Sequence, residues 1–130
     1  MILRQSAIAA HAIECVQRAQ DDPKIFAEYG TRANSFPSMI VQVGLAQALG
    51  FLRAKSGDNT SLAKAYNRYY TDLFELTRIA IPDAPEDPDR FYHHVLRAEL
   101  GEYRRLSQTI LDASVWLKRI YQGTDKRGGE

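Results

Sequence analysis

The stretch 36–52 is apolar nearly throughout, and no other feature of the sequence constrains the fold as strongly. Ser35 is a favourable N-cap and Pro37 fits a first helical turn, so we predict a helix that begins at Ser35. It is expected to continue to the basic residues at 53–55. A helix that is apolar on nearly all sides must be surrounded by other helices. The sequence therefore predicts a helical bundle with this helix at its centre.

Three other long stretches have the apolar spacing of helices that pack along one face. They are 2–20, 61–80 and 102–122. Two shorter helices are predicted to begin at Pro23 and Pro88, each with a preceding aspartate as N-cap. We expect the first to end before Gly30 and the second at a break near Gly101. No segment alternates like a β-strand, so the predicted fold class is all-α, a compact helical bundle of about four main helices plus one short helix.

The composition fits one globular domain. The chain has 130 residues, of which 45% are hydrophobic and 25% are charged. That length is sufficient to bury one core and too short for two. Because Gly123 is predicted to end the last helix, we predict a single helical-bundle domain at 1–123. The residues at 124–130 are expected to form a polar C-terminal tail.

Cysteine usage and hydropathy predict a cytoplasmic protein. The single cysteine, Cys15, excludes an intrachain disulfide and favours a reducing compartment. No apolar run approaches the ~20 residues that span a bilayer, so no membrane segment is expected. The stretch 1–20 carries charged residues where a signal peptide needs an uninterrupted apolar core.

No pattern in the sequence is typical of an enzyme. His93 and His94 are adjacent and would point about 100° apart on a helix, and His11 is remote in sequence. No glutamate has a histidine three residues on, as a di-iron bundle requires. There is no glycine-rich phosphate loop, and no motif marks an activated nucleophile. We therefore predict a protein that is not an enzyme, with no catalytic residues, no cofactor and no bound metal.

Basic residues at predicted helix ends are the first candidates for contact with RNA. Cations there oppose the negative pole of the helix dipole, so stabilisation of the helix is an equally good explanation. The residues are Arg53, Lys55, Lys118 and Arg119. Lysine and arginine number 17 against 16 acidic residues, a net charge of +1. Any contact with nucleic acid must therefore be local or shared with partners.

Arg104 and Arg105 are candidates for a different reason. They fall in the first turn of a helix predicted to begin at about Glu102, where the helix dipole disfavours a cation. A partner is therefore predicted to retain them. A phosphate would suffice, and so would a carboxylate such as Glu99. The argument depends on the predicted start of the helix.

Two motifs go beyond the pattern of a generic bundle. The first is Gly-Leu-Ala-Gln-Ala-Leu-Gly-Phe-Leu-Arg-Ala-Lys at 44–55. The second is Tyr-Arg-Arg-Leu-Ser at 103–107, followed by Leu111 and by Trp-Leu-Lys-Arg at 116–119. Both resemble the small α-helical subunit of type III-B CRISPR RNA-targeting effectors, the Cmr complex. The chain departs from the pattern of that family at 41–43, where polar or basic residues are common.

The resemblance implies a non-catalytic subunit, present in several copies, that stacks beside the backbone subunits. It implies that these copies help line the groove for guide and target RNA, while cleavage belongs to other subunits. The expected partners are other CRISPR effector subunits, chiefly the backbone subunit, together with guide and target RNA. Residues 56–98 carry no motif of the family.

Two alternatives stay open. The related small subunit of the type III-A complex would share the architecture and the role. A helical adaptor that binds only protein would use its basic residues to stabilise helix ends alone. Charge reversal at Arg104 and Arg105 separates an RNA-binding subunit from such an adaptor.

Overall fold

A computed structural model describes the backbone of residues 4–128 and the side chains of 5–124, and this part of the chain contains helices and no strand. The helices are α1 (Arg4–Ala19), α2 (Pro23–Val43), α3 (Leu45–Lys55), α4 (Ser61–Ala80), α5 (Pro88–Arg97) and α6 (Leu100–Gly128). The all-α fold class is confirmed. Its six helices exceed the predicted four plus one, and the predicted helix start at Ile2 lies outside the described residues.

The central helix is α4, which packs against each of the other five helices. Its predicted apolar seam is buried except for Leu62, which is 44% exposed. Edge-to-face contacts of Tyr69 with Tyr29 and Phe36 join α4 to α2. The buried members of the seam are Tyr66, Tyr69, Leu73, Leu76 and Ala80.

The single helix predicted at 35–55 is wrong, because the backbone breaks at Gly44. This glycine has φ 87° and ψ 160°, a conformation open essentially only to glycine. The Ala46 N–H, at the exposed start of α3, donates to the Tyr103 hydroxyl at 3.0 Å. A side chain of α6 thus satisfies a donor of α3 that no N-cap side chain reaches.

The short helix predicted to end before Gly30 is also wrong, since α2 begins at the predicted Asp22 cap and continues to Val43. Gly30 is buried, and a Cβ there would collide with the Tyr121 ring of α6. This glycine therefore permits close packing of α2 on α6. Ser35 donates to the Thr31 carbonyl at 2.8 Å inside the helix and caps nothing.

The region that seemed apolar on all sides is not fully enclosed. Val41 and Val43 are 73% and 46% exposed at the end of α2. Gly50 does have the predicted packing role, because a Cβ there would lie 2.7 Å from the Tyr92 hydroxyl of α5.

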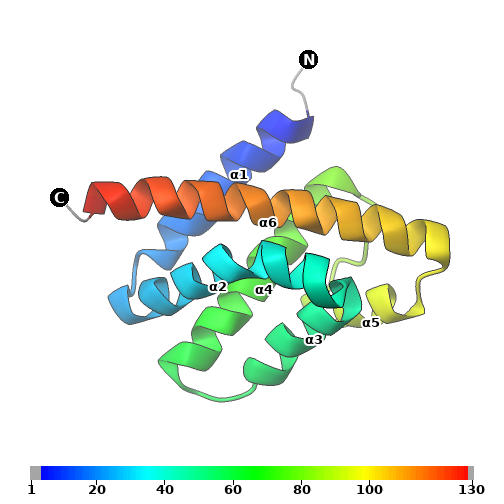
Figure 1. Ribbon diagram of the computed structural model, residues 1–130, viewed down its shortest axis with the longest axis horizontal. Helices are drawn as coiled ribbons and strands as arrows, with labels where there is room; N and C mark the ends of the chain where they lie inside the picture. The colour runs from blue at the N-terminus through cyan, green and yellow to red at the C-terminus, as the bar shows by residue number, and fades with distance from the viewer. Residues whose placement is uncertain (1–3, 129–130) are drawn as a thin grey trace.

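α6 runs along the longest axis of the molecule and packs on α1, α2 and α4 (Figure 1). It follows a break at 98–99, close to the predicted one, and continues to Gly128, so its predicted end at Gly123 is wrong. Thr124 Oγ1 donates to the Ile120 carbonyl at 2.9 Å, as helical threonines do. The division into a domain at 1–123 and a tail at 124–130 stays a prediction. No described helix is long and apolar enough to cross a membrane.

Gly44→Ala is expected to lower the free energy of unfolding by about 1 to 3 kcal/mol, because alanine is strained at this φ and ψ. A Cβ at Gly44 would lie 3.7 Å from the Tyr103 hydroxyl, an ordinary contact, so the backbone causes the loss. Urea unfolding followed by circular dichroism measures it. Gly101→Ala is the control, because its Cβ would meet nothing within 4 Å and its φ is not positive. Equal stability of the two variants would contradict the assignment.

Candidate nucleic-acid interface

The outer face of α6 brings together four of the six predicted cations. Arg104 and Arg105 precede Lys118 and Arg119 by two heptads, so both pairs lie on the same side of the helix. At about 1.5 Å per residue, the pairs are roughly 21 Å apart along the axis. Lys118 is half-buried and the other three are exposed. The outer face of α6 can therefore contact a polyanion at two points.

These four cations have few competing partners. Arg105 Nη1 lies 3.8 Å from Glu102 Oε2, at 51% and 34% exposure, which makes a weak pair. The other three make no ion pair with a described side chain. Because α6 begins at Leu100, Arg104 and Arg105 lie in its second turn, and the expected conflict with the first turn does not arise.

The other two predicted cations lie on α3. Arg53 Nη2 is 3.1 Å from Asp89 Oδ1 of α5, and its guanidinium lies 4.7 Å from the centre of the Tyr70 ring. Arg53 thus joins α3 to α5 and α4, which is a structural role. Lys55 is exposed, with its ammonium 6.0 Å from the centre of the Phe51 ring. Neither residue belongs to the outer face of α6.

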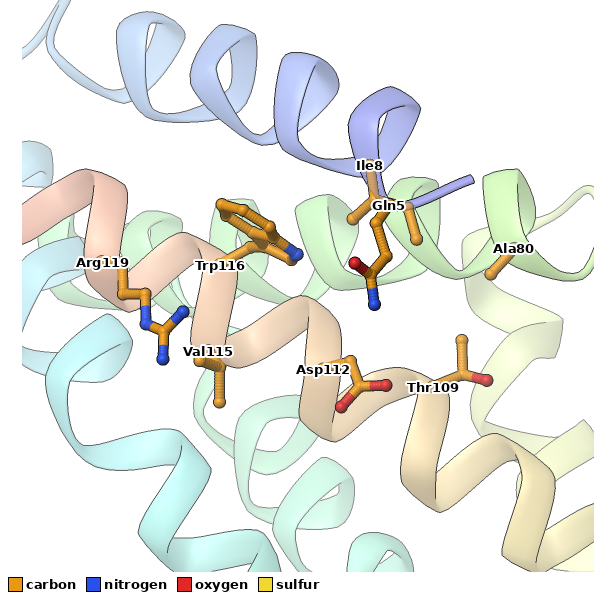
Figure 2. A pocket seen from close by; sticks show the side chains of 8 residues that line it. All are labelled: Gln5, Ile8, Ala80, Thr109, Asp112, Val115, Trp116 and Arg119. Atoms are coloured by element: carbon orange, nitrogen blue, oxygen red, sulfur yellow. The ribbon is translucent and has the colours of Figure 1, made fainter. Parts of the chain in front are cut away.

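A groove of about 460 Å³ lies between α1, the end of α4 and α6. In Figure 2 the Gln5 amide points from α1 toward Asp112 and Thr109, and the Trp116 indole lies below α1. Arg119 stands at one end of the groove. The lining residues are Gln5, Ile8, Ala80, Thr109, Asp112, Val115, Trp116 and Arg119. Sequence reasoning missed this groove, because it forms only when α1 and α6 pack together.

A polar cluster joins α1 to α4. His11 Nε2 and Arg18 Nη2 contact Glu75 Oε2 at 3.0 and 2.8 Å, and Arg18 also lies 3.4 Å from Cys15 Sγ. For Glu75, the effect of burial is outweighed by these hydrogen bonds from Arg18 and His11, so its pKa is lowered. Spacing of four on α1 makes His11 and Cys15 neighbours, but their proximity to Glu75 needs the tertiary fold.

The donors of His11, Cys15 and Glu75 lie within 4.8 Å of one another, the type of set that can hold a metal ion. Here the Arg18 guanidinium already contacts both Cys15 and Glu75, so a cation occupies this position. Burial raises the pKa of the Cys15 thiol to about 12, which disfavours the thiolate that a metal would bind. The geometry therefore describes an ion pair between helices.

Cys15 is expected to resist alkylation by iodoacetamide at pH 8 in the folded protein. The side chain is 0% exposed, and its raised pKa keeps the thiol protonated. In denaturant the thiol should recover a pKa of about 8.5 and react readily. Mass spectrometry of the labelled protein measures both rates. Similar rates in the two conditions would show that the thiol is accessible in the folded state.

The fold and the site define a class: an all-helical protein whose longest helix displays two pairs of cations on its outer face. A family model described as "CRISPR-associated protein (Cas_Cmr5)" matches residues 4–124. The chain belongs to this family, the small subunit of the type III-B Cmr complex. The resemblance seen in the two sequence motifs is thereby confirmed.

Two proteins of Thermus thermophilus are similar to the chain. "CRISPR system Cmr subunit Cmr5" is 31% identical over 100 residues, which cover 73% of this chain and 73% of the relative. The X-ray crystal structure of a CRISPR-associated Cmr5 family protein is 28% identical and matches with a TM-score of 0.78. That match covers 95% of this chain and 97% of the other. The similarity thus extends over nearly the whole fold.

Proposed function

We propose that this chain is a non-catalytic small subunit of a cytoplasmic type III-B CRISPR effector complex. Several copies stack beside the backbone subunits and help line the groove for guide and target RNA. Membership of the Cmr5 family supports the type III-B assignment over the type III-A alternative. The observation that carries the RNA-binding role is the outer face of α6, where Arg104, Arg105, Lys118 and Arg119 lie together.

Repetition makes such a small number of cations effective. The chain has a net charge of +1, so one copy binds RNA weakly and without sequence preference. Each copy offers a few cations to the phosphates, and stacked copies add them into one continuous track. The affinity of the complex for RNA should then depend steeply on salt.

Omission of the chain tests this proposal. Complexes are assembled from the other subunits and guide RNA with and without this chain, and target-RNA affinity is measured across a salt series. We expect weaker binding and a shallower dependence on salt without it, by about 0.7 in the log–log slope for each phosphate that is no longer neutralised. Identical affinity and slope would contradict a role in the RNA groove.

A protein-only adaptor is the second candidate, and the groove beside Trp116 favours it. An aromatic side chain that is half-buried among polar groups is typical of an anchor for a partner protein. The adaptor would affect assembly and leave the affinity of the assembled complex for RNA unchanged. The omission experiment separates the two, because it reports assembly and RNA affinity independently.

A further inference from the structure

α5 presents a second basic surface, which none of the sequence motifs covers. A hollow of about 580 Å³ is lined by Pro85, Arg90, His93, His94 and Arg97. Arg90, His93 and Arg97 are spaced by three and four residues, so they share one face of the helix, and all three are exposed. No acidic side chain is among the lining residues. We call these four basic residues the α5 basic face.

The charges of the α5 basic face are only weakly neutralised. Arg90 Nε lies 3.9 Å from Asp87 Oδ2, with the side chains 83% and 50% exposed, so the pair contributes little. Arg97 makes no ion pair with any side chain in the described part of the chain. Asp89, the other acid of the helix, contacts Arg53 of α3 at 3.1 Å. Two guanidinium groups are thus available to an anion.

Stabilisation of the helix accounts for only part of this face. His94 and Arg97 lie in the last turn of α5, where cations oppose the negative pole of the dipole. Arg90 lies near the opposite end, within the first turns after Asp87, where the dipole disfavours a cation. A separate reason is needed for its position beside Arg97 in one hollow.

The α5 basic face adjoins the outer face of α6. His94 Nε2 lies 3.7 Å from Glu102 Oε1, and Arg105 Nη1 lies 3.8 Å from Oε2 of the same carboxylate. Glu102 therefore lies between the two surfaces and contacts a residue of each. A chain of phosphates that contacts Arg104 and Arg105 on α6 can continue along α5.

We infer that the α5 basic face binds the phosphodiester backbone of single-stranded RNA and extends the track that begins on α6. The guanidinium groups of Arg90 and Arg97 each match a phosphate with two parallel hydrogen bonds. The imidazoles of His93 and His94 add donors without reading the base. This inference rests on the proposed function, because it needs RNA to pass along α6.

Charge reversal at two positions tests it. Arg90→Glu/Arg97→Glu is assembled into the complex, and binding of labelled target RNA is measured by fluorescence anisotropy across a salt series. At 50 mM salt we expect about a tenfold loss of affinity for each phosphate released, and a slope lower by about 0.7 for each. Arg90→Ala/Arg97→Ala should give a smaller loss in the same direction. Circular dichroism checks that both variants are folded.

Lys24→Glu/Lys64→Glu is the matched control, since these lysines are exposed and lie on α2 and α4. A loss no larger than that of the control overturns the inference. Arg104→Glu/Arg105→Glu, measured in parallel, shows which proposal fails. If only the α6 variant weakens binding, the α5 inference is wrong and the proposed function stands. If neither variant weakens it, both are wrong.

Discussion

Asp72→Ala is expected to lower the free energy of unfolding by about 3 to 5 kcal/mol, because it leaves buried partners uncompensated. The Asp72 carboxylate is 0% exposed at the centre of the bundle. Arg68 Nε and Nη2 contact its Oδ1 at 2.9 and 2.7 Å. The Tyr29 hydroxyl donates to Oδ2 at 2.7 Å, and Arg18 lies 3.7 Å away. One side chain of α4 thus holds groups of α1, α2 and α4.

The energetic balance at Asp72 is finely set. Burial raises the pKa of the Asp72 carboxyl, and the charge of Arg68 with the hydrogen bond from Tyr29 opposes that rise. Removal of the carboxylate leaves the buried Tyr29 hydroxyl without this acceptor and Arg68 without its closest counter-charge. Unsatisfied groups of this kind cost more than the net gain of the bonds they formed.

Urea unfolding at pH 7, followed by far-ultraviolet circular dichroism, measures this prediction. Glu86→Ala is the control, because Glu86 is 89% exposed and lies 3.9 Å from Arg78. Its effect should stay within about 0.5 kcal/mol. A loss below about 1 kcal/mol for Asp72→Ala would show that the cluster does not hold α1 and α2 on α4.

Arg104→Glu/Arg105→Glu should weaken target-RNA binding by the assembled complex by about a hundredfold at 50 mM salt, at about tenfold for each phosphate released. The log–log salt dependence should become shallower by about 1.4 for two phosphates. Both arginines are exposed, so the protein should fold and assemble as before. Repulsion between the new carboxylates and phosphate adds to the loss.

Anisotropy with labelled RNA gives the affinities, and size-exclusion chromatography confirms assembly. Lys24→Glu/Lys64→Glu again serves as the control for net charge. Unchanged RNA affinity in a fully assembled complex would favour the protein-only adaptor. Failure to assemble would show instead that this face of α6 contacts protein.

Local signals in the sequence predicted several elements correctly. Asp22 and Asp87 cap α2 and α5 as expected, and Thr60 caps α4 next to the predicted start. Each of these caps is decided by one side chain and the nearest backbone N–H groups. The apolar seam of α4 was predictable because period 3.6 directly reflects burial on one side.

Other boundaries depended on tertiary contacts. Gly30 looks like a helix end, but the Tyr121 ring packs against its bare backbone and the helix continues. Gly44 looks like a packing glycine, but its positive φ breaks the helix. The hydroxyl that satisfies the next helix comes from Tyr103, which is far away in sequence. Composition alone could not distinguish these two glycines.

The candidate interface shows the same division. The gathering of four cations on α6 follows from their spacing on one helix, which the sequence displays. The structural role of Arg53 depends on Asp89 of another helix. The α5 basic face and the groove beside Trp116 need the packing of several helices, so no local pattern indicated them.

The most direct test of the account is to purify the tagged protein from its native cells after a moderate salt wash. Mass spectrometry would then identify the proteins retained, and sequencing would identify the RNA. We predict that several CRISPR effector subunits and repeat-derived guide RNAs co-purify with it. Recovery of the chain alone, or with unrelated proteins and no guide RNA, would contradict the proposed role.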